Sequence, residues 1–82
     1  MPSSWIVYIL RCNDGTLYTG VTNDLERRLA AHQKGTAARY TRSRRPVKIV
    51  YREASPGRGA ALRREAEIKR LRRSEKLELA RR

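Results

Sequence analysis

The first apolar segment runs from Trp5 to Leu10, with apolar residues at both odd and even positions. Such a run is typical of a strand covered on both faces, so we place it at the centre of a sheet. Asn13-Asp14-Gly15 follows and favours a tight turn, because these residues tolerate positive φ. Residues 16–21 predict the returning strand of a hairpin, in which Gly20 allows another group to approach the backbone closely.

A helix is predicted after the hairpin. Asn23 is the expected N-cap, Glu26 stands three residues later as in a capping box, and Gly35 is a suitable residue to end the helix. Arg28 and His32 are four residues apart and therefore lie on one side of this helix. From the pattern alone we expect this pair at an exposed edge.

The second half of the chain predicts one more strand and two more helices. On the strand, Val47, Ile49 and Tyr51 alternate and are expected to share one face. Ser74 is the expected cap of the last helix. The order ββαβαα predicts an α+β fold of one domain over residues 1–82, a three-stranded antiparallel sheet flanked by helices. The remaining elements are a basic loop at 35–45, a strand at 47–53, a helix at 60–72 and a short helix at 75–81.

Glu65 lies on the apolar stripe of the first of these two helices, between Leu62 and Ile68. Glu67 is about 200° away from that stripe at 100° per residue. A carboxylate that faces the core must be paired, protonated or bound to a cation. An ion pair with Lys69, or with an arginine from another element, and a bound cation are equally compatible with the sequence.

The charge of the chain indicates a polyanionic partner. Its 82 residues include 20 Lys and Arg against 8 Asp and Glu, a net charge of +12 with a pI near 11.3. Nucleic acid is the leading candidate. From Arg27 to Arg52 there are nine basic residues and no acidic one, which favours contact with a phosphate backbone over a merely solvated face. The candidate contacts are Arg27, Lys34, Arg39, Arg42, Arg44, Arg45 and Lys48.

The composition excludes several other classes of protein. Cys12 is the single cysteine and His32 the single histidine, so neither an internal disulfide nor a four-ligand zinc site can form. The apolar run of Trp5 to Leu10 is too short for a membrane span of about 20 residues or a signal-peptide core of roughly 7 to 15. We therefore expect a cytoplasmic protein with no membrane partner.

Four motifs occur in an informative order. They are Val7-Tyr8, then Tyr18-Thr19-Gly20, then Leu25-Glu26-Arg27-Arg28-Leu29, and finally Arg64-Glu65-Ala66-Glu67-Ile68-Lys69. This series resembles the GIY-YIG nuclease superfamily, and most of all its small single-domain members, from residue 5 to about residue 76. The resemblance implies the same sheet flanked by helices. Two positions depart from the motifs, since Ile6 replaces the first glycine and Thr19 the central isoleucine.

The resemblance also implies an active site. Tyr8 and Tyr18 match the tyrosines of the two motifs, Arg28 the helix arginine, His32 a histidine of some members, and Glu65 the metal-binding glutamate. With one Mg²⁺ or Mn²⁺ ion, Arg28 on the phosphate and Tyr8 as the base, these residues would form a DNA endonuclease. DNA is favoured over RNA, processing of structured DNA or DNA repair is the expected setting, and a protein partner would supply target specificity. The alternative is a non-catalytic nucleic-acid-binding module with the same fold.

Overall fold

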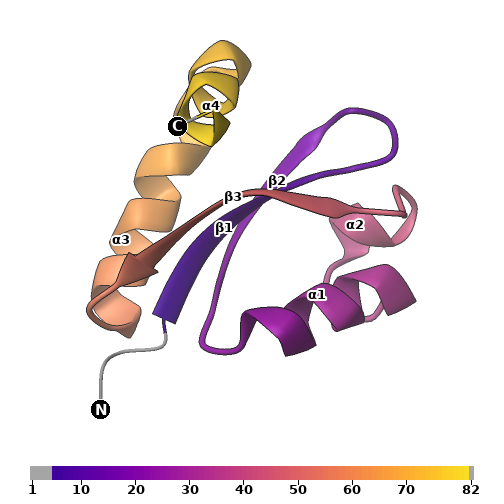
Figure 1. Cartoon of the computed structure of the whole chain (residues 1–82), viewed down its shortest axis with the longest axis horizontal. Coiled ribbons are helices and arrows are strands. Elements are labelled where there is room, and N and C mark those ends of the chain that lie inside the picture. Colours follow the sequence, from indigo (N-terminus) through magenta and orange to yellow (C-terminus); the bar gives the residue numbers. More distant parts are fainter. Residues whose placement is uncertain (1–4, 82) are drawn as a thin grey trace.

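The computed structural model describes residues 5–81 and contains one antiparallel sheet of three strands in the order β2-β1-β3 (Figure 1). The apolar strand β1 is central, as its continuous hydrophobic pattern predicted. The predicted α+β class and the order ββαβαα are confirmed. The elements are β1 (Trp5–Arg11), β2 (Leu17–Thr22), α1 (Leu25–Lys34), α2 (Arg39–Arg42), β3 (Lys48–Ser55), α3 (Arg58–Lys69) and α4 (Arg73–Ala80).

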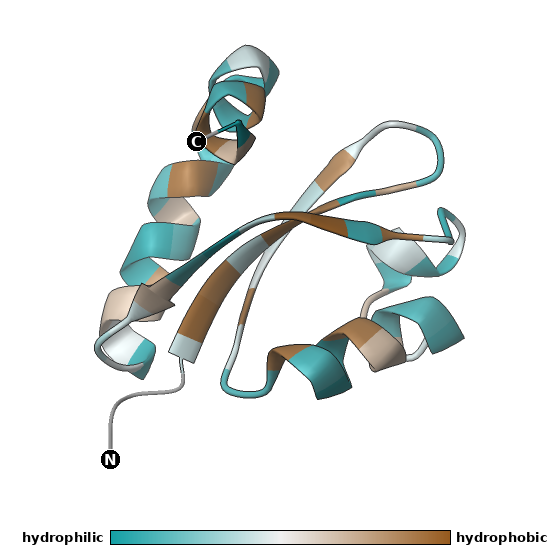
Figure 2. Ribbon diagram, in the orientation of Figure 1, coloured by the Kyte–Doolittle hydropathy of each residue, from teal (hydrophilic) through white to brown (hydrophobic). Residues whose placement is uncertain are grey.

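Helices cover both faces of the sheet, α1 and α2 on one side and α3 and α4 on the other (Figure 1). Tyr8 and Leu10 of β1 pack in the core on the α1 side, whereas Val7 and Ile9 pack with α3. Hydrophobic residues accordingly run along β1 between the two layers (Figure 2). Each such side chain contributes about 1.5–3 kcal/mol when it is fully buried, and β1 supplies four of the buried hydrophobic residues of the described core.

A bulge in β3 changes which residues share a face. Ile9 pairs with Tyr51 but the next residue, Leu10, pairs with Ile49, so Val50 is an extra residue in the ladder. The inserted residue reverses the alternation of side chains beyond it. Ile49 therefore packs on the α1 side and Tyr51 on the α3 side. The prediction that Ile49 and Tyr51 share a face was wrong for this reason.

The cap of α1 lies one residue later than predicted. Asp24, not Asn23, is the N-cap, and its carboxylate accepts a hydrogen bond of 3.1 Å from the Arg27 backbone N–H. The Thr22 hydroxyl accepts a hydrogen bond from the Asp24 N–H at 3.0 Å. Strand β2 therefore continues to Thr22, one residue further than predicted, and the helix starts one residue later. The end was predicted correctly, since Gly35 adopts a left-handed conformation with φ of 82°.

The helical boundaries after α1 also differ from the predicted ones. The basic loop contains the single turn α2, and α4 is capped at Arg72 instead of Ser74. There the Glu75 carboxylate accepts from the Arg72 N–H at 2.9 Å. Leu62 is 39% exposed, because Ala61 and Ile68 form the side of α3 that packs on the sheet. No helix within the described residues is long and apolar enough to cross a membrane.

Candidate active site

Gly20 allows two strands to bring their tyrosines together. It lies opposite Tyr8 in the β1–β2 ladder. A Cβ atom on Gly20 would lie 2.5 Å from the Tyr8 hydroxyl oxygen, 2.7 Å from Tyr8 Cζ and 3.2 Å from Tyr18 Cε2. The close approach to the backbone expected at this glycine is therefore made by the tyrosine rings themselves, and any larger residue would displace them.

A chain of buried hydrogen bonds starts at Tyr8. Its hydroxyl is 2.9 Å from His32 Nε2, and His32 Nδ1 is 2.8 Å from the Thr41 hydroxyl oxygen. The Thr41 hydroxyl donates its one proton to the Ala38 carbonyl oxygen, so it accepts from His32 Nδ1–H. In a neutral imidazole the other nitrogen is then an acceptor. The Tyr8 hydroxyl therefore donates its hydrogen bond to His32 Nε2.

Burial and nearby charges shift the pKa values of this pair. His32 is 1% exposed, so the prediction of an exposed edge was wrong, because the sheet and α2 close over that side of α1. Burial, followed by the charge of Arg28, lowers the pKa of His32. Burial is also the main cause that raises the pKa of Tyr8, with Tyr18 and Glu65 adding to it and Arg28 opposing it. Both groups are therefore neutral at pH 7.

Tyr18 is the more accessible of the two tyrosines. It is partly exposed, whereas Tyr8 is 2% exposed. Its ring meets the His32 ring edge-on at 5.2 Å between centroids and stacks on Tyr40 at 5.8 Å. Within residues 5–81 its hydroxyl has no hydrogen-bond partner. The Tyr18 hydroxyl is therefore held in place by its ring and remains available to a water or a phosphate.

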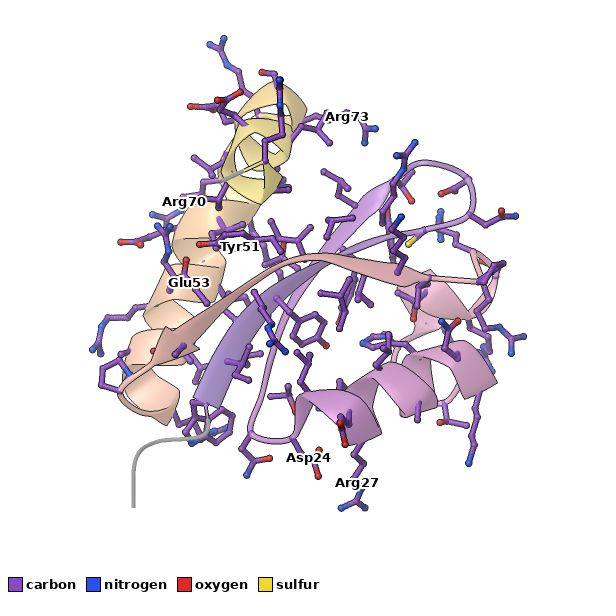
Figure 3. All side chains as sticks on the ribbon, in the orientation of Figure 1. Asp24, Arg27, Tyr51, Glu53, Arg70 and Arg73 are labelled. Carbon is purple, nitrogen blue, oxygen red and sulfur yellow. The ribbon has the colours of Figure 1, made fainter. Side chains whose placement is uncertain are left out.

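Arg28 lies at the edge of this cluster. Its side chain is exposed, and its charge affects the pKa of both Tyr8 and His32. With Arg27 it lines a polar cavity of about 360 Å³ beside the start of α1, where Figure 3 shows Arg27 and Asp24. A guanidinium in this position offers two parallel hydrogen bonds to phosphate oxygens.

Glu65 is the acidic member of the cluster. Its side chain is 19% exposed, against 63% for Glu67, as its position on the helix predicted. Lys69 Nζ lies 3.3 Å from Glu65 Oε2, so the ion pair that the sequence left open is formed. The charge of Glu65 nevertheless acts on the Tyr8 phenol. Helix α3 therefore carries one carboxylate within electrostatic range of Tyr8.

The chemistry of Glu65 fits a metal ion held mainly by water and substrate. Within residues 5–81 no group of three or more His, Cys, Asp or Glu side chains could enclose an ion. The nearby carboxylates of Glu53 and Glu67 are both paired with Arg64, at 3.0 and 3.3 Å (Figure 3 labels Glu53). Mg²⁺ commonly uses one or two carboxylates and completes its shell with water and phosphate oxygens. Glu65 has the hard oxygen donors that such a site needs.

The predicted phosphate contacts fall into two groups. Arg44 donates from Nε to Asp14 at 3.1 Å and from a terminal nitrogen to the Tyr40 carbonyl at 2.7 Å. Arg45 donates to the carbonyls of Arg42 and Gln33. These two arginines hold α2 and the end of α1 in place. The side chains of Arg27, Lys34, Arg39, Arg42 and Lys48 are exposed and form no ion pair with any described residue.

Sequence comparison identifies the family of this arrangement. The family model of the GIY-YIG catalytic domain matches residues 4–78. The chain belongs to the GIY-YIG family. This is a family of nuclease domains, so membership supports a nuclease-like function with nucleic acid as the substrate class.

Similar GIY-YIG proteins bear names that state no activity. A UPF0213 protein of Nitratidesulfovibrio vulgaris is 58% identical over 66 residues. The matched region covers 80% of this chain but only 60% of the length of that relative. One from Staphylococcus saprophyticus is 48% identical over 73 residues, or 89% of each chain. The solution NMR structure of a UPF0213 protein from Bacillus halodurans shows the same fold, with a TM-score of 0.58 and 45% identity over 92% of this chain and 80% of that one.

Sequence reasoning missed two residues of the candidate site. Thr41 is 0% exposed and sets the proton position on His32, and Tyr40 supports the Tyr18 ring. Both stand in the segment that was predicted as an irregular basic loop. Their distance from the other site residues along the chain left no periodic signal. Only the turn α2 brings them under α1.

The neutral, buried His32 should make folding stability depend on pH. Because its folded-state pKa lies below the ordinary 6.5, the unfolded chain binds the proton more readily. Stability is therefore full above about pH 6.5 and falls at lower pH, by at most about 1.4 kcal/mol per pH unit for one proton. Urea unfolding at pH 7.5 and 5.5 measures this loss. His32→Phe should lack it, and an equal loss in that variant would show that other groups cause it.

Proposed function

We propose that this protein is a metal-dependent endonuclease that hydrolyses phosphodiester bonds in DNA. The observation that carries the proposal is that a free phenol at Tyr18 contacts the buried pair of Tyr8 and His32, while the charges of the Arg28 guanidinium and the Glu65 carboxylate both act on Tyr8. These three kinds of group can orient a water, neutralise phosphate charge and hold a metal ion, as phosphodiester hydrolysis requires. Membership in a nuclease family supports the same conclusion.

Arg28 and Glu65 would interact with different charged groups, Arg28 with the phosphate and Glu65 with the metal ion. Arg28, on α1, would bind the phosphate and stabilise the negative charge that develops on it during attack. Glu65, on α3, would hold one Mg²⁺ or Mn²⁺, which when bound neutralises phosphate charge and assists departure of the leaving oxygen. Lys69, the ion-pair partner of Glu65, is 54% exposed and therefore well solvated when released, so a dication would compete with it at little cost.

The two tyrosines have different surroundings, and this favours different roles. Tyr8 is buried, its hydroxyl donates a hydrogen bond to His32, and its pKa is raised. It would therefore position its neighbours Tyr18 and His32 through packing and hydrogen bonding. The Tyr18 hydroxyl has no partner among the described residues and would contact the attacking water. We accordingly favour Tyr18 over Tyr8 as the group that orients this water, and as its base once the Tyr18 phenol has released its own proton to solvent.

The exposed basic residues would bind the rest of the substrate. Arg27, Arg39 and Arg42 lie on α1 and α2, the two helices that carry or support Arg28, His32 and Tyr18. Contacts of this kind position a nucleic acid without reading its sequence. Target choice would then come from DNA structure, such as the branches and nicks met in repair, or from a protein partner. A cytoplasmic location accords with this role.

Cleavage of a substrate panel tests the proposal. Labelled duplex, nicked, flapped and branched DNA, with matched single strands and RNA, is incubated with Mg²⁺, with Mn²⁺ or with EDTA. We expect cleavage of one or more structured DNAs with either metal and none with EDTA. Tight binding to all of them with no cleavage under any metal would instead support the non-catalytic binding module, in which the Glu65–Lys69 ion pair is purely structural.

A further inference from the structure

An exposed aromatic side chain lies one ring away from the candidate site. Tyr40 on α2 is 39% exposed, which makes it one of the few large hydrophobic residues on the described surface. Its ring stacks on that of Tyr18 at 5.8 Å with an angle of 30° between the planes. The guanidinium carbon of Arg44 lies 4.1 Å from the centre of the Tyr40 ring. Tyr18, Tyr40 and Arg44 thus form a continuous stack of planar groups that leads outward from the site.

The outer member of this stack is fixed in its orientation. Arg44 donates from Nε to Asp14 in the β1–β2 turn and from a terminal nitrogen to the Tyr40 carbonyl. Two hydrogen bonds in the guanidinium plane keep that plane against the ring, while the side chain remains 34% exposed. A planar surface held this way loses little conformational entropy when a second planar group is placed on it.

The charge around Tyr40 indicates what would be placed there. Arg39 and Arg42 flank it on α2, both exposed, and neither has an ion pair with any residue in 5–81. A ligand that combines flat aromatic faces with negative charge matches this surface. Unpaired nucleotides have this chemistry, because their bases stack on tyrosine rings and guanidinium planes while their phosphates face basic side chains. In a duplex the base faces are already covered by neighbouring base pairs.

We propose that the outer face of the Arg44 guanidinium, held flat against the Tyr40 ring, is a stacking surface for an unpaired base of single-stranded DNA beside the cleaved phosphate. The inference rests on the proposed function and narrows its substrate class to DNA with a single-stranded segment at the site. Stacking of one base changes affinity by roughly 10-fold or more. Binding of single-stranded and flapped DNA should therefore depend on Arg44 and on the Tyr40 ring that supports it, and binding of fully paired DNA should not.

Binding measured in EDTA tests this surface separately from catalysis. A fluorescent single strand containing 2-aminopurine and a duplex of equal length are titrated with the protein and with Tyr40→Leu and Tyr40→Phe. We expect Tyr40→Leu to weaken single-strand binding about 10-fold, to change duplex binding less than 2-fold, and to abolish 2-aminopurine quenching. Tyr40→Phe keeps the ring and should bind like the parent protein. Lys34→Ala is the charge control and should weaken both substrates alike.

A second variant keeps the test decisive if Tyr40→Leu lowers folding stability. Tyr40→Trp keeps a ring beneath Arg44, and its added fluorescence should be changed by single-stranded but not by duplex DNA, with the signal of Trp5 in the parent protein as the background. Equal affinities of the parent protein and Tyr40→Leu for single strands, or equal losses on both substrates, would overturn the stacking surface. Failure of the parent protein to cleave any substrate would overturn the endonuclease proposal and leave this binding result intact.

Discussion

Replacing Glu65 with glutamine should lower metal-dependent cleavage by about 10²-fold or more. Among the described residues Glu65 is the one carboxylate whose charge acts on Tyr8, and the neighbouring Glu53 and Glu67 are both held by Arg64. Glutamine keeps the size of the side chain and removes the charge that would hold a divalent ion. Single-turnover cleavage at several Mg²⁺ concentrations measures the loss.

Two controls separate a metal ligand from half of an ion pair. Glu67→Gln removes a more exposed carboxylate from the same helix and should leave the cleavage rate unchanged. Lys69→Ala removes the partner of Glu65 at 3.3 Å, and the loss of such a surface pair costs about 0.3–0.5 kcal/mol. If Glu65→Gln and Lys69→Ala lose the same activity and the same stability, the carboxylate is structural and the metal role of Glu65 is wrong.

Replacing Gly20 with alanine should lower both stability and activity. The added Cβ would lie 2.5 Å from the Tyr8 hydroxyl oxygen, and 3.2 Å from Tyr18 Cε2, so both rings must move. Overpacking of this kind costs about 1–3 kcal/mol in the free energy of unfolding. Displacement of Tyr8 also stretches its hydrogen bond to His32, and misplacement of reacting groups by about 1 Å costs about 10²-fold in rate.

Gly59 provides the matched control for the same chemical change. It lies inside α3, where an added Cβ would approach an Arg63 nitrogen at 3.5 Å, an ordinary contact. Gly59→Ala should therefore stabilise the protein by about 0.5–1 kcal/mol, because alanine is the better helix former. Urea unfolding of both variants decides the matter. A Gly20→Ala protein as stable as the parent would show that the tyrosine rings do not pack against β2 as described.

Local patterns in the sequence were sufficient for the plan of the fold. A strand that is apolar on both faces has to be central, and the turn residues after Leu10 define the hairpin. The spacing of Glu65 and Glu67 predicted which carboxylate is sheltered, because helical geometry depends only on separation along the chain. The motifs that contain Tyr8, Tyr18 and Gly20 were sufficient to suggest the family, which comparison confirmed.

The site itself depends on contacts between residues far apart in the chain. His32 was predicted at an exposed edge, and it is buried because Tyr8, 24 residues away, and Thr41, nine residues away, enclose it. No periodicity within α1 contains that information. The bulge at Val50 likewise arises from pairing with β1, and it alone decides that Tyr51 faces α3.

The roles of the basic residues were also decided by the tertiary structure. Arg44 and Arg45 look like phosphate contacts in a run of cations that lacks any acid. In the folded chain Arg44 meets Asp14 from a distant turn, and Arg45 meets a carbonyl at the end of α1. The sequence by itself determined the order of the main strands and helices, the family and the excess of positive charge, because composition and short-range spacing encode them. Hydrogen-bond partners that only packing brings within about 3 Å of each other decide the rest. They decide which basic side chains are left without a partner, and which ring nitrogen of His32 carries the proton.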